Sequence, residues 1–367
     1  MQAYFGTKHC YLVSSGKAAL TLILQALREL YPDRDQVLIP AFACYSVPSA
    51  IVRAGLRVQL CDIDLQTLDY DYAQLEEKLK NPKLLCVLSL HLFGLPANVE
   101  RLKQIRQDPI ITIVEDAAQA MGGEWQGKKL GTIGDVGFFS LGRGKALTAV
   151  EGGVILTDND MLSDRLRALE EGLSECNALK TVTQFVYALA LILLLRPAFY
   201  WIPNSMPFLH LGETRFDPHF PLLRLSGFQA GLLQNFKAKL SRSRTARREN
   251  IQFWLDNCSN LGVQCLGSQA LIPDLIRFPF HLASQESTER LLDKSRTQGY
   301  GIARTYPDAI HGIQELKNQF VGQDFANARQ AAQELLTLPV HGFLNDKDRE
   351  HILQLLAVEV VSPRRRI

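Results

Sequence analysis

The fold of this chain is decided by residues 136–157, which read VGFFSLGRGKALTAVEGGVILT. Two short apolar runs, each typical of a strand, enclose a loop that glycines interrupt and that carries Ser140 and Lys145. The amine of such a lysine can bond covalently to an aldehyde cofactor, and a nearby serine could face the phosphate of that cofactor. The alternative is a solvated loop lysine, and this stretch alone does not separate the two.

Length and composition limit the classes of protein to consider. At 367 residues the chain is long enough for a large and a smaller domain. Forty basic and 38 acidic residues leave a net charge of +2, which gives no reason to expect a nucleic-acid partner. The seven cysteines are odd in number and form no Cys-x-x-Cys pair, so we expect neither a disulfide framework nor a metal site. They fit a reducing cytoplasm, and the N-terminus shows no export signal.

The first half of the chain predicts a doubly wound α/β sheet. Apolar strands at 36–40, 57–60, 84–90 and 110–114 alternate with helical stretches, as in βαβ units. Continuous apolar runs are typical of parallel strands that are buried on both faces. We predict a large α/β domain at 1–235, with an apolar insert at about 180–220, and a small C-terminal α+β domain at 236–367.

Several candidate site residues lie where these strands end, which is where ligands bind in such sheets. Ser15 and Gly16 begin a helix and leave backbone N–H groups free for an anion, although a plain N-cap explains them as well. Asp116 follows a strand and could hold a protonated ring nitrogen or simply cap a helix, and Gln119 lies one turn further on. His91 also ends a strand, where a structural hydrogen bond competes with a catalytic role.

The insert contains eleven uninterrupted apolar residues at 185–195, followed by Arg-Pro and an aromatic cluster that ends at 203. About twenty residues are needed to span a bilayer, so we do not predict a membrane-spanning helix. A buried helix, an oligomer contact and an element in a membrane interface remain open for 185–203. A long helix from about 221 to 257 follows, and we interpret its basic run at 237–248 as a solvated face.

Taken in order, these motifs resemble the DegT/StrS family of fold-type I aminotransferases, most of which act on nucleotide sugars. The similarity covers nearly the whole chain and rests on Ser15-Gly16, His91-Leu92-Phe93-Gly94, Glu115-Asp116-Ala117-Ala118-Gln119, Gly127 to Gly131, Phe139-Ser140 with Lys145, Glu151-Gly152-Gly153, Arg224 with Gln229-Ala230, and Leu338-Pro339-Val340-His341. The resemblance implies a large domain with a mostly parallel sheet of seven-stranded type, flanked by helices, and a smaller α+β domain.

The resemblance also implies a cofactor, pyridoxal 5′-phosphate, and a role for each matching residue. Lys145 would hold the cofactor covalently and move a proton, and Asp116 would pair with the ring nitrogen. Gln119 would lie against the ring, while Ser140 and the Gly16 and Lys17 amides would bind the phosphate. His91 and Arg224 are candidates for substrate binding.

The reaction that the resemblance implies is transfer of an amino group, with glutamate as donor, to a nucleotide-linked keto sugar in polysaccharide or glycoconjugate biosynthesis. Related sugar dehydratases carry histidine in place of Lys145, which favours a transaminase. The family completes its site from a neighbouring subunit, so we expect a homodimer. A non-catalytic regulatory or assembly protein, and an aminotransferase for a non-sugar keto compound, are the alternatives.

Three positions depart from the family pattern. Lys17 replaces the usual threonine, and Leu222 replaces a phosphate-binding asparagine that the partner chain supplies. We hypothesise that the Lys17 ammonium compensates for the missing donor. Cys44 replaces the aromatic residue that covers the ring, which leaves Phe42 or Tyr45 for that role.

Overall fold

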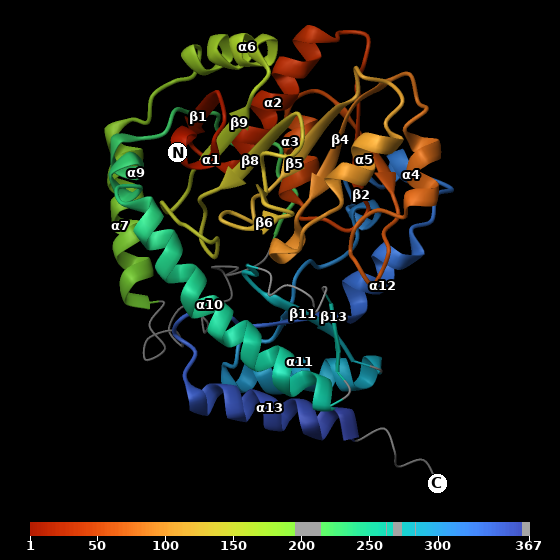
Figure 1. The fold of residues 1–367 in the computed structure, drawn as a ribbon, viewed down its shortest axis with the longest axis vertical. Helices are drawn as coiled ribbons and strands as arrows, with labels where there is room; N and C mark the ends of the chain where they lie inside the picture. The colour runs from red at the N-terminus through yellow and green to blue at the C-terminus, as the bar shows by residue number, and fades with distance from the viewer. Residues whose placement is uncertain (195–213, 262, 267–273, 283, 362–367) are drawn as a thin grey trace.

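The computed structural model describes residues 1–194, 214–261, 263–266, 274–282 and 284–361, and Figure 1 shows its ribbon. Within these residues, seven strands form a large sheet in the order β1-β9-β8-β5-β4-β2-β3. The pairs from β3 across to β8 are parallel, whereas both pairs that β9 makes are antiparallel. The mostly parallel sheet is therefore confirmed. Its strands are β1 (His9–Val13), β2 (Gln36–Pro40), β3 (Arg57–Cys61), β4 (Leu84–Leu90), β5 (Thr112–Asp116), β8 (Val136–Ser140) and β9 (Gly153–Thr157).

Both faces of this sheet are covered by helices. Successive side chains of a strand point to opposite faces, so each strand contributes to two buried clusters. Val37 and Ile39 belong to one buried cluster and Leu38 to the other. The first cluster receives side chains from helices α2 (Gly16–Leu30), α3 (Ser46–Arg53) and α6 (Asp160–Glu171), and the second from α4 (Tyr72–Lys78) and α5 (Val99–Ile105). Helix α1 (Gln2–Phe5) and the short strands β6 (Glu124–Trp125) and β7 (Lys128–Lys129) lie outside the large sheet.

A second sheet, antiparallel and in the order β10-β11-β13-β12, forms the C-terminal part of the chain. The long helix α10 (Phe236–Cys258) runs from the large sheet toward it, and α13 lies along its far side (Figure 1). The smaller α+β part is thus confirmed, whereas the boundary between 235 and 236 remains a prediction. Its elements are β10 (Gln264–Cys265), β11 (Phe278–His281), β12 (Ala303–Arg304), β13 (Leu335–Leu338), α11 (Gln285–Gln298), α12 (Ala326–Glu334) and α13 (Asp346–Val361).

The long helix predicted from 221 to 257 is two helices. Helix α9 (Gly227–Leu232) begins in a capping box, in which Ser226 and Gln229 each accept a hydrogen bond from the other's backbone N–H. It ends shortly before Asn235, whose φ of 56° is left-handed and interrupts the helical path. Helix α10 starts at the next residue.

The interpretation of the basic run 237–248 as a solvated face is wrong for Arg244, which is half-buried, and for Arg247, whereas Arg248 is exposed. Arg244 and Arg248 both form ion pairs with Asp274, at 2.7 and 2.8 Å, and that carboxylate is buried. Arg247 is itself buried, and this burial lowers its pKa to about 10. Ile276 N donates to the Phe93 carbonyl at 2.8 Å, so these arginines hold a segment that packs against the large domain.

The apolar insert contributes helix α7 (Ala178–Leu194), while the rest of the predicted 185–203 element lies outside the described residues. Most large apolar side chains of α7 are exposed, so the buried-helix interpretation is wrong for the described part. None of the helices that the structure describes combines the length and hydropathy needed to cross a bilayer.

Candidate active site

The candidate site is a cavity of about 220 Å³ at the carboxyl ends of β4, β5 and β8, next to the N-terminus of α2. Residues from separate parts of the sequence meet there, as expected for a parallel sheet. The predicted residues that line it are Ser15, Gly16, Lys17, His91, Asp116, Gln119, Ser140 and Lys145. Two other predicted residues, Tyr45 and Arg224, are not among its lining.

One end of the cavity is suited to an anion. The Ser15 hydroxyl accepts a hydrogen bond from Ala18 N at 3.1 Å, which leaves the Gly16 and Lys17 amides without a partner in the helix. Gly153 pairs with Val13 on one side and with Ser140 on the other, so the sheet brings Ser140 beside the start of α2. A phosphate could receive hydrogen bonds from both elements.

The close approach of the start of α2 to Ser140 requires a glycine at position 16. A Cβ atom added at Gly16 would lie 2.8 Å from Ser140 Cβ, which is well inside the ordinary contact distance of two carbon atoms. The backbone of α2 therefore reaches Ser140 only because residue 16 has no side chain.

Asp116, at the end of β5, places a carboxylate in the cavity. Its hydrogen-bond donor within the described residues is Ala118 N, at 3.0 Å. Burial raises the pKa of Asp116, and the Ala118 hydrogen bond and the Lys145 charge oppose that effect. Among the described residues this carboxylate has no cationic hydrogen-bond donor, and a protonated ring nitrogen would supply one.

Lys145 lines the cavity from the loop between β8 and β9. The base of the loop is closed by backbone hydrogen bonds from Leu141 N to Gly152 O and from Ala149 N to Leu141 O, at 2.8 and 2.9 Å. In the part of the chain that the structure describes, the Lys145 ammonium has neither a hydrogen bond nor an ion pair. Its amine is therefore available for covalent chemistry.

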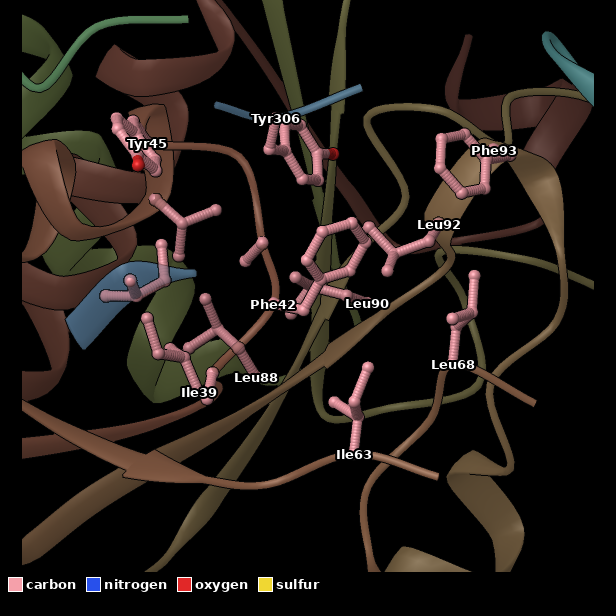
Figure 2. Close-up of a cluster of buried hydrophobic side chains, with 14 of the residues drawn as sticks. Ile39, Phe42, Tyr45, Ile63, Leu68, Leu88, Leu90, Leu92, Phe93 and Tyr306 are labelled. Carbon is pink, nitrogen blue, oxygen red and sulfur yellow. The ribbon is translucent and has the colours of Figure 1, made fainter. Parts of the chain in front are cut away.

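Gln119 is fixed at both ends of its amide. Its Oε1 accepts from Phe93 N at 2.8 Å, and its Nε2 donates to the Tyr306 hydroxyl at 3.0 Å. Tyr306 comes from the C-terminal part, lines the cavity and packs against the Phe42 ring at 5.1 Å (Figure 2). Sequence reasoning missed Tyr306, because 187 positions separate it from Gln119 and no local motif marks it.

Tyr45 differs from its predicted place. Cys44 lines the cavity instead, and Figure 2 shows the Tyr45 ring apart from Phe42 and Tyr306. Burial, with a contribution from the Asp308 charge, raises the pKa of Tyr45 to about 12. The side chain is used in packing between the two parts of the chain, so the prediction that Tyr45 covers a cofactor ring is not supported by its position.

His91 has no ring nitrogen free for a substrate. Ala97 N donates to Nδ1 at 3.0 Å, so the proton lies on Nε2, which donates to the Glu115 carboxylate at 2.8 Å. Glu115 is fully buried and also accepts hydrogen bonds from the backbone N–H groups of Gly131, Ile133 and Gly134. This network supports the structural alternative for His91 and fixes the loop behind the strand ends.

Residues 214–220 lie beside the anion end of the cavity. The Lys17 ammonium is 3.8 Å from the Asp217 carboxylate and 4.3 Å from the centre of the Phe220 ring. Thr214 contacts Cys44 Sγ at 3.2 Å, and Asp217 N donates to Ser49 Oγ at 3.0 Å. Lys17 is therefore placed by an ion pair and a cation–π contact near the site predicted for the phosphate.

Arg224 lies outside the cavity of its own chain. Its guanidinium donates to the carbonyls of Glu170 and Glu171, at 3.3 and 3.0 Å, in the last turn of α6. A cation there stabilises the helix terminus. A contact of Arg224 with substrate would have to involve the site of another subunit.

The residues of the cavity fit pyridoxal 5′-phosphate. They provide a free amine, a partly buried carboxylate and an anion site around one hollow, and Gly16 keeps the anion site open. The fold and site thus define a pocket of the type that holds a phosphorylated aldehyde cofactor.

Comparison with known proteins agrees with this assignment. The chain belongs to the DegT/DnrJ/EryC1/StrS aminotransferase family, which it matches over residues 1–357, so the family resemblance is confirmed. It is 35% identical to L-glutamine:2-deoxy-scyllo-inosose aminotransferase of Streptoalloteichus tenebrarius over 167 residues, 46% of this chain and 39% of that protein. The chain spans less than half the length of this relative and of the six curated relatives that follow it.

Two further similarities extend along nearly the whole chain. A pleiotropic regulatory protein of Geobacillus stearothermophilus is 24% identical over 366 residues, which cover 97% of this chain and 86% of that protein. The solved structure of Helicobacter pylori PseC, an aminotransferase involved in the biosynthesis of pseudoaminic acid, superimposes with a TM-score of 0.77 at 18% identity, and the match covers 98% of this chain and 89% of that one. This structural likeness supports the fold.

Proposed function

We propose that this protein is a pyridoxal phosphate-dependent aminotransferase that transfers an amino group, with glutamate as donor, to a keto sugar carried on a nucleotide. The observation that supports this most is the convergence of Lys145, Asp116 and the Gly16–Ser140 contact on one cavity. Family membership and the sugar aminotransferases among the relatives support the class of substrate.

The roles of the residues follow from their positions. Lys145 would hold the cofactor covalently, Asp116 would accept a hydrogen bond from its ring nitrogen, and Ser140 with the α2 amides would bind its phosphate. When bound, the cofactor supplies an acceptor for the negative charge that develops on the substrate carbon.

The chain itself supplies the proton transfer and the orientation. The Lys145 amine can take a proton from the donor carbon and return one to the acceptor, since nothing described holds it in an ion pair. Gln119 is held at both atoms of its amide, which fixes the plane of that group, so it would lie against the ring.

A homodimer belongs to the same proposal. The Arg224 segment caps α6 and contributes nothing to the cavity of its own chain, which fits a role of this region at a subunit contact. Light scattering should give twice the mass of 41.1 kDa, and a monomer that is fully active would refute the shared site.

The proposed activity is tested in two half-reactions. Glutamate, or the glutamine named for the Streptoalloteichus relative, should change the visible absorption of the cofactor-loaded protein and yield the corresponding keto acid. The protein, with the amino group now on its cofactor, should then regain its first spectrum when one member of a panel of keto-sugar nucleotides is added. No spectral change with either donor would favour a non-catalytic protein, and turnover with simple keto acids alone would favour a non-sugar substrate.

A further inference from the structure

Helix α7 carries an apolar stripe that the other described parts of the chain leave exposed. The side chains of this stripe are between 49% and 76% exposed, whereas large apolar residues elsewhere are mostly buried. They recur at steps of three and four residues and so share one face of the helix. The apolar stripe consists of Leu179, Val182, Phe185, Val186, Leu189, Ile192 and Leu193.

The helix is held to the protein mainly by its other face. The Gln184 side chain is buried, and its Oε1 accepts from the Ser226 hydroxyl at 2.9 Å. Beside it, the Tyr187 hydroxyl accepts from Arg143 at 3.1 Å, and Arg143 belongs to the loop that carries Lys145. Phe185, at one edge of the stripe, also packs edge-on against the Phe228 ring at 5.8 Å. These contacts fix the orientation of α7 and leave the rest of the stripe exposed.

The charges on and around α7 indicate what covers the stripe. From Cys176 to Leu194 the sequence contains no acidic residue, and Lys180 is the one charged residue. Arg143 adds a second cation at the side of the helix. An apolar helix face that has cations beside it and no carboxylate on the helix itself is complementary to a surface of anionic lipids.

A second copy of α7 fits this face less well. Leu179, Val182, Val186, Leu189 and Leu193 have the spacing of a helix-pairing seam. The positions that flank such a seam normally carry charges that select partner and register, and here they are Thr183, Phe185, Ala190 and Ile192. Phe185 and Ile192 widen the seam to a broad apolar face, which suits the non-directional contact with acyl chains.

We propose that α7 docks this protein on the surface of an anionic bilayer, with the helix axis in the membrane plane and the apolar stripe inserted among the acyl chains. The 17 residues of α7 make between four and five helical turns, which suffices for a surface anchor. The proposal does not depend on the proposed amino transfer, because it rests on the exposed face of α7 and the charges beside it.

Sedimentation with sucrose-loaded vesicles tests the proposal on the full-length protein. Vesicles of roughly two parts phosphatidylcholine to one part phosphatidylglycerol should carry the protein down, and binding should weaken several-fold with phosphatidylcholine alone or at high salt. Replacing Val186 and Leu189 by glutamine together should lower the partition coefficient at least about tenfold, since two apolar side chains leave the lipid.

Thr183→Gln is the matched control, because it adds the same side chain to an exposed position of α7 outside the apolar stripe. It should bind vesicles as the unaltered protein does, and circular dichroism should show that all variants are folded. Absence of binding to anionic vesicles, or equal binding by the double variant, would overturn the proposal. So would a solution oligomer that the double variant dissociates without any effect of vesicles, since a second copy would then cover the stripe.

Discussion

Replacement of Gly16 by alanine tests whether the close approach of α2 to Ser140 builds the anion site. The added Cβ would lie 2.8 Å from Ser140 Cβ, whereas carbon atoms pack at about 3.5 to 4.0 Å. The helix and strand must therefore separate by about 1 Å. Ser140 Cβ is close to the backbone of a central strand and cannot turn aside as the end of a long side chain would.

The expected cost has two parts. Overpacking of a well-packed site typically destabilises the fold by about 1 to 3 kcal/mol. Separation of the α2 amides from the Ser140 hydroxyl also weakens a hydrogen bond to a charged phosphate, about 1.5 to 3 kcal/mol, or roughly tenfold or more in cofactor affinity.

Gly227→Ala is the matched control for this change. Gly227 also follows an N-cap serine as the first residue of a helix, and a Cβ added there meets no atom within 4 Å. In urea unfolding, the Gly227→Ala variant should be as stable as the unaltered protein or more stable by about 0.4 to 1 kcal/mol.

Fluorescence titration with pyridoxal phosphate measures the loss of cofactor affinity in the Gly16→Ala variant. Unchanged cofactor affinity in the Gly16→Ala variant, with a stability like that of Gly227→Ala, would refute the argument that this glycine keeps the anion site open.

Three further substitutions examine the rest of the cavity. Asp116→Asn should stabilise the cofactor-free protein at pH 7 by about 1 kcal/mol, because burial raises the folded-state pKa of this acid and its ionised form is unfavourable. The gain should vanish in urea unfolding below about pH 4, where the unfolded chain is also protonated, and cofactor binding should weaken. Tyr306→Phe leaves Gln119 Nε2 without its acceptor and should cost about 1 to 3 kcal/mol in thermal unfolding; no loss would contradict the role of that hydrogen bond. Lys17→Ala should lower cofactor affinity about tenfold, and an unchanged affinity would refute the hypothesis that its ammonium compensates for Leu222.

The sequence predicts those parts of the site that follow from strand ends. Asp116 and Ser140 end adjacent strands, and Ser15 begins the helix beside them, so a single rule for parallel sheets brings them together. The glycines of the loop and the free lysine in it are likewise local features.

Contacts between distant segments could not be predicted in this way. Tyr306 reaches Gln119 across the two parts of the chain, and Tyr45 lies close enough to Asp308, far along the sequence, for that charge to act on its pKa. Arg247 is buried, although a run of basic residues gives no sign of it. The break before α10 depends on one left-handed asparagine, a conformation that many asparagines do not adopt.

The central claim is that the amine of Lys145 holds the cofactor. Borohydride reduction of the cofactor-loaded protein, followed by peptide mass spectrometry, locates the bonded lysine directly. We expect the added cofactor mass on the peptide that contains Lys145 and no stable label in a Lys145→Arg variant. A label on Lys17 or another lysine, or no label in a protein that binds the cofactor, would contradict it.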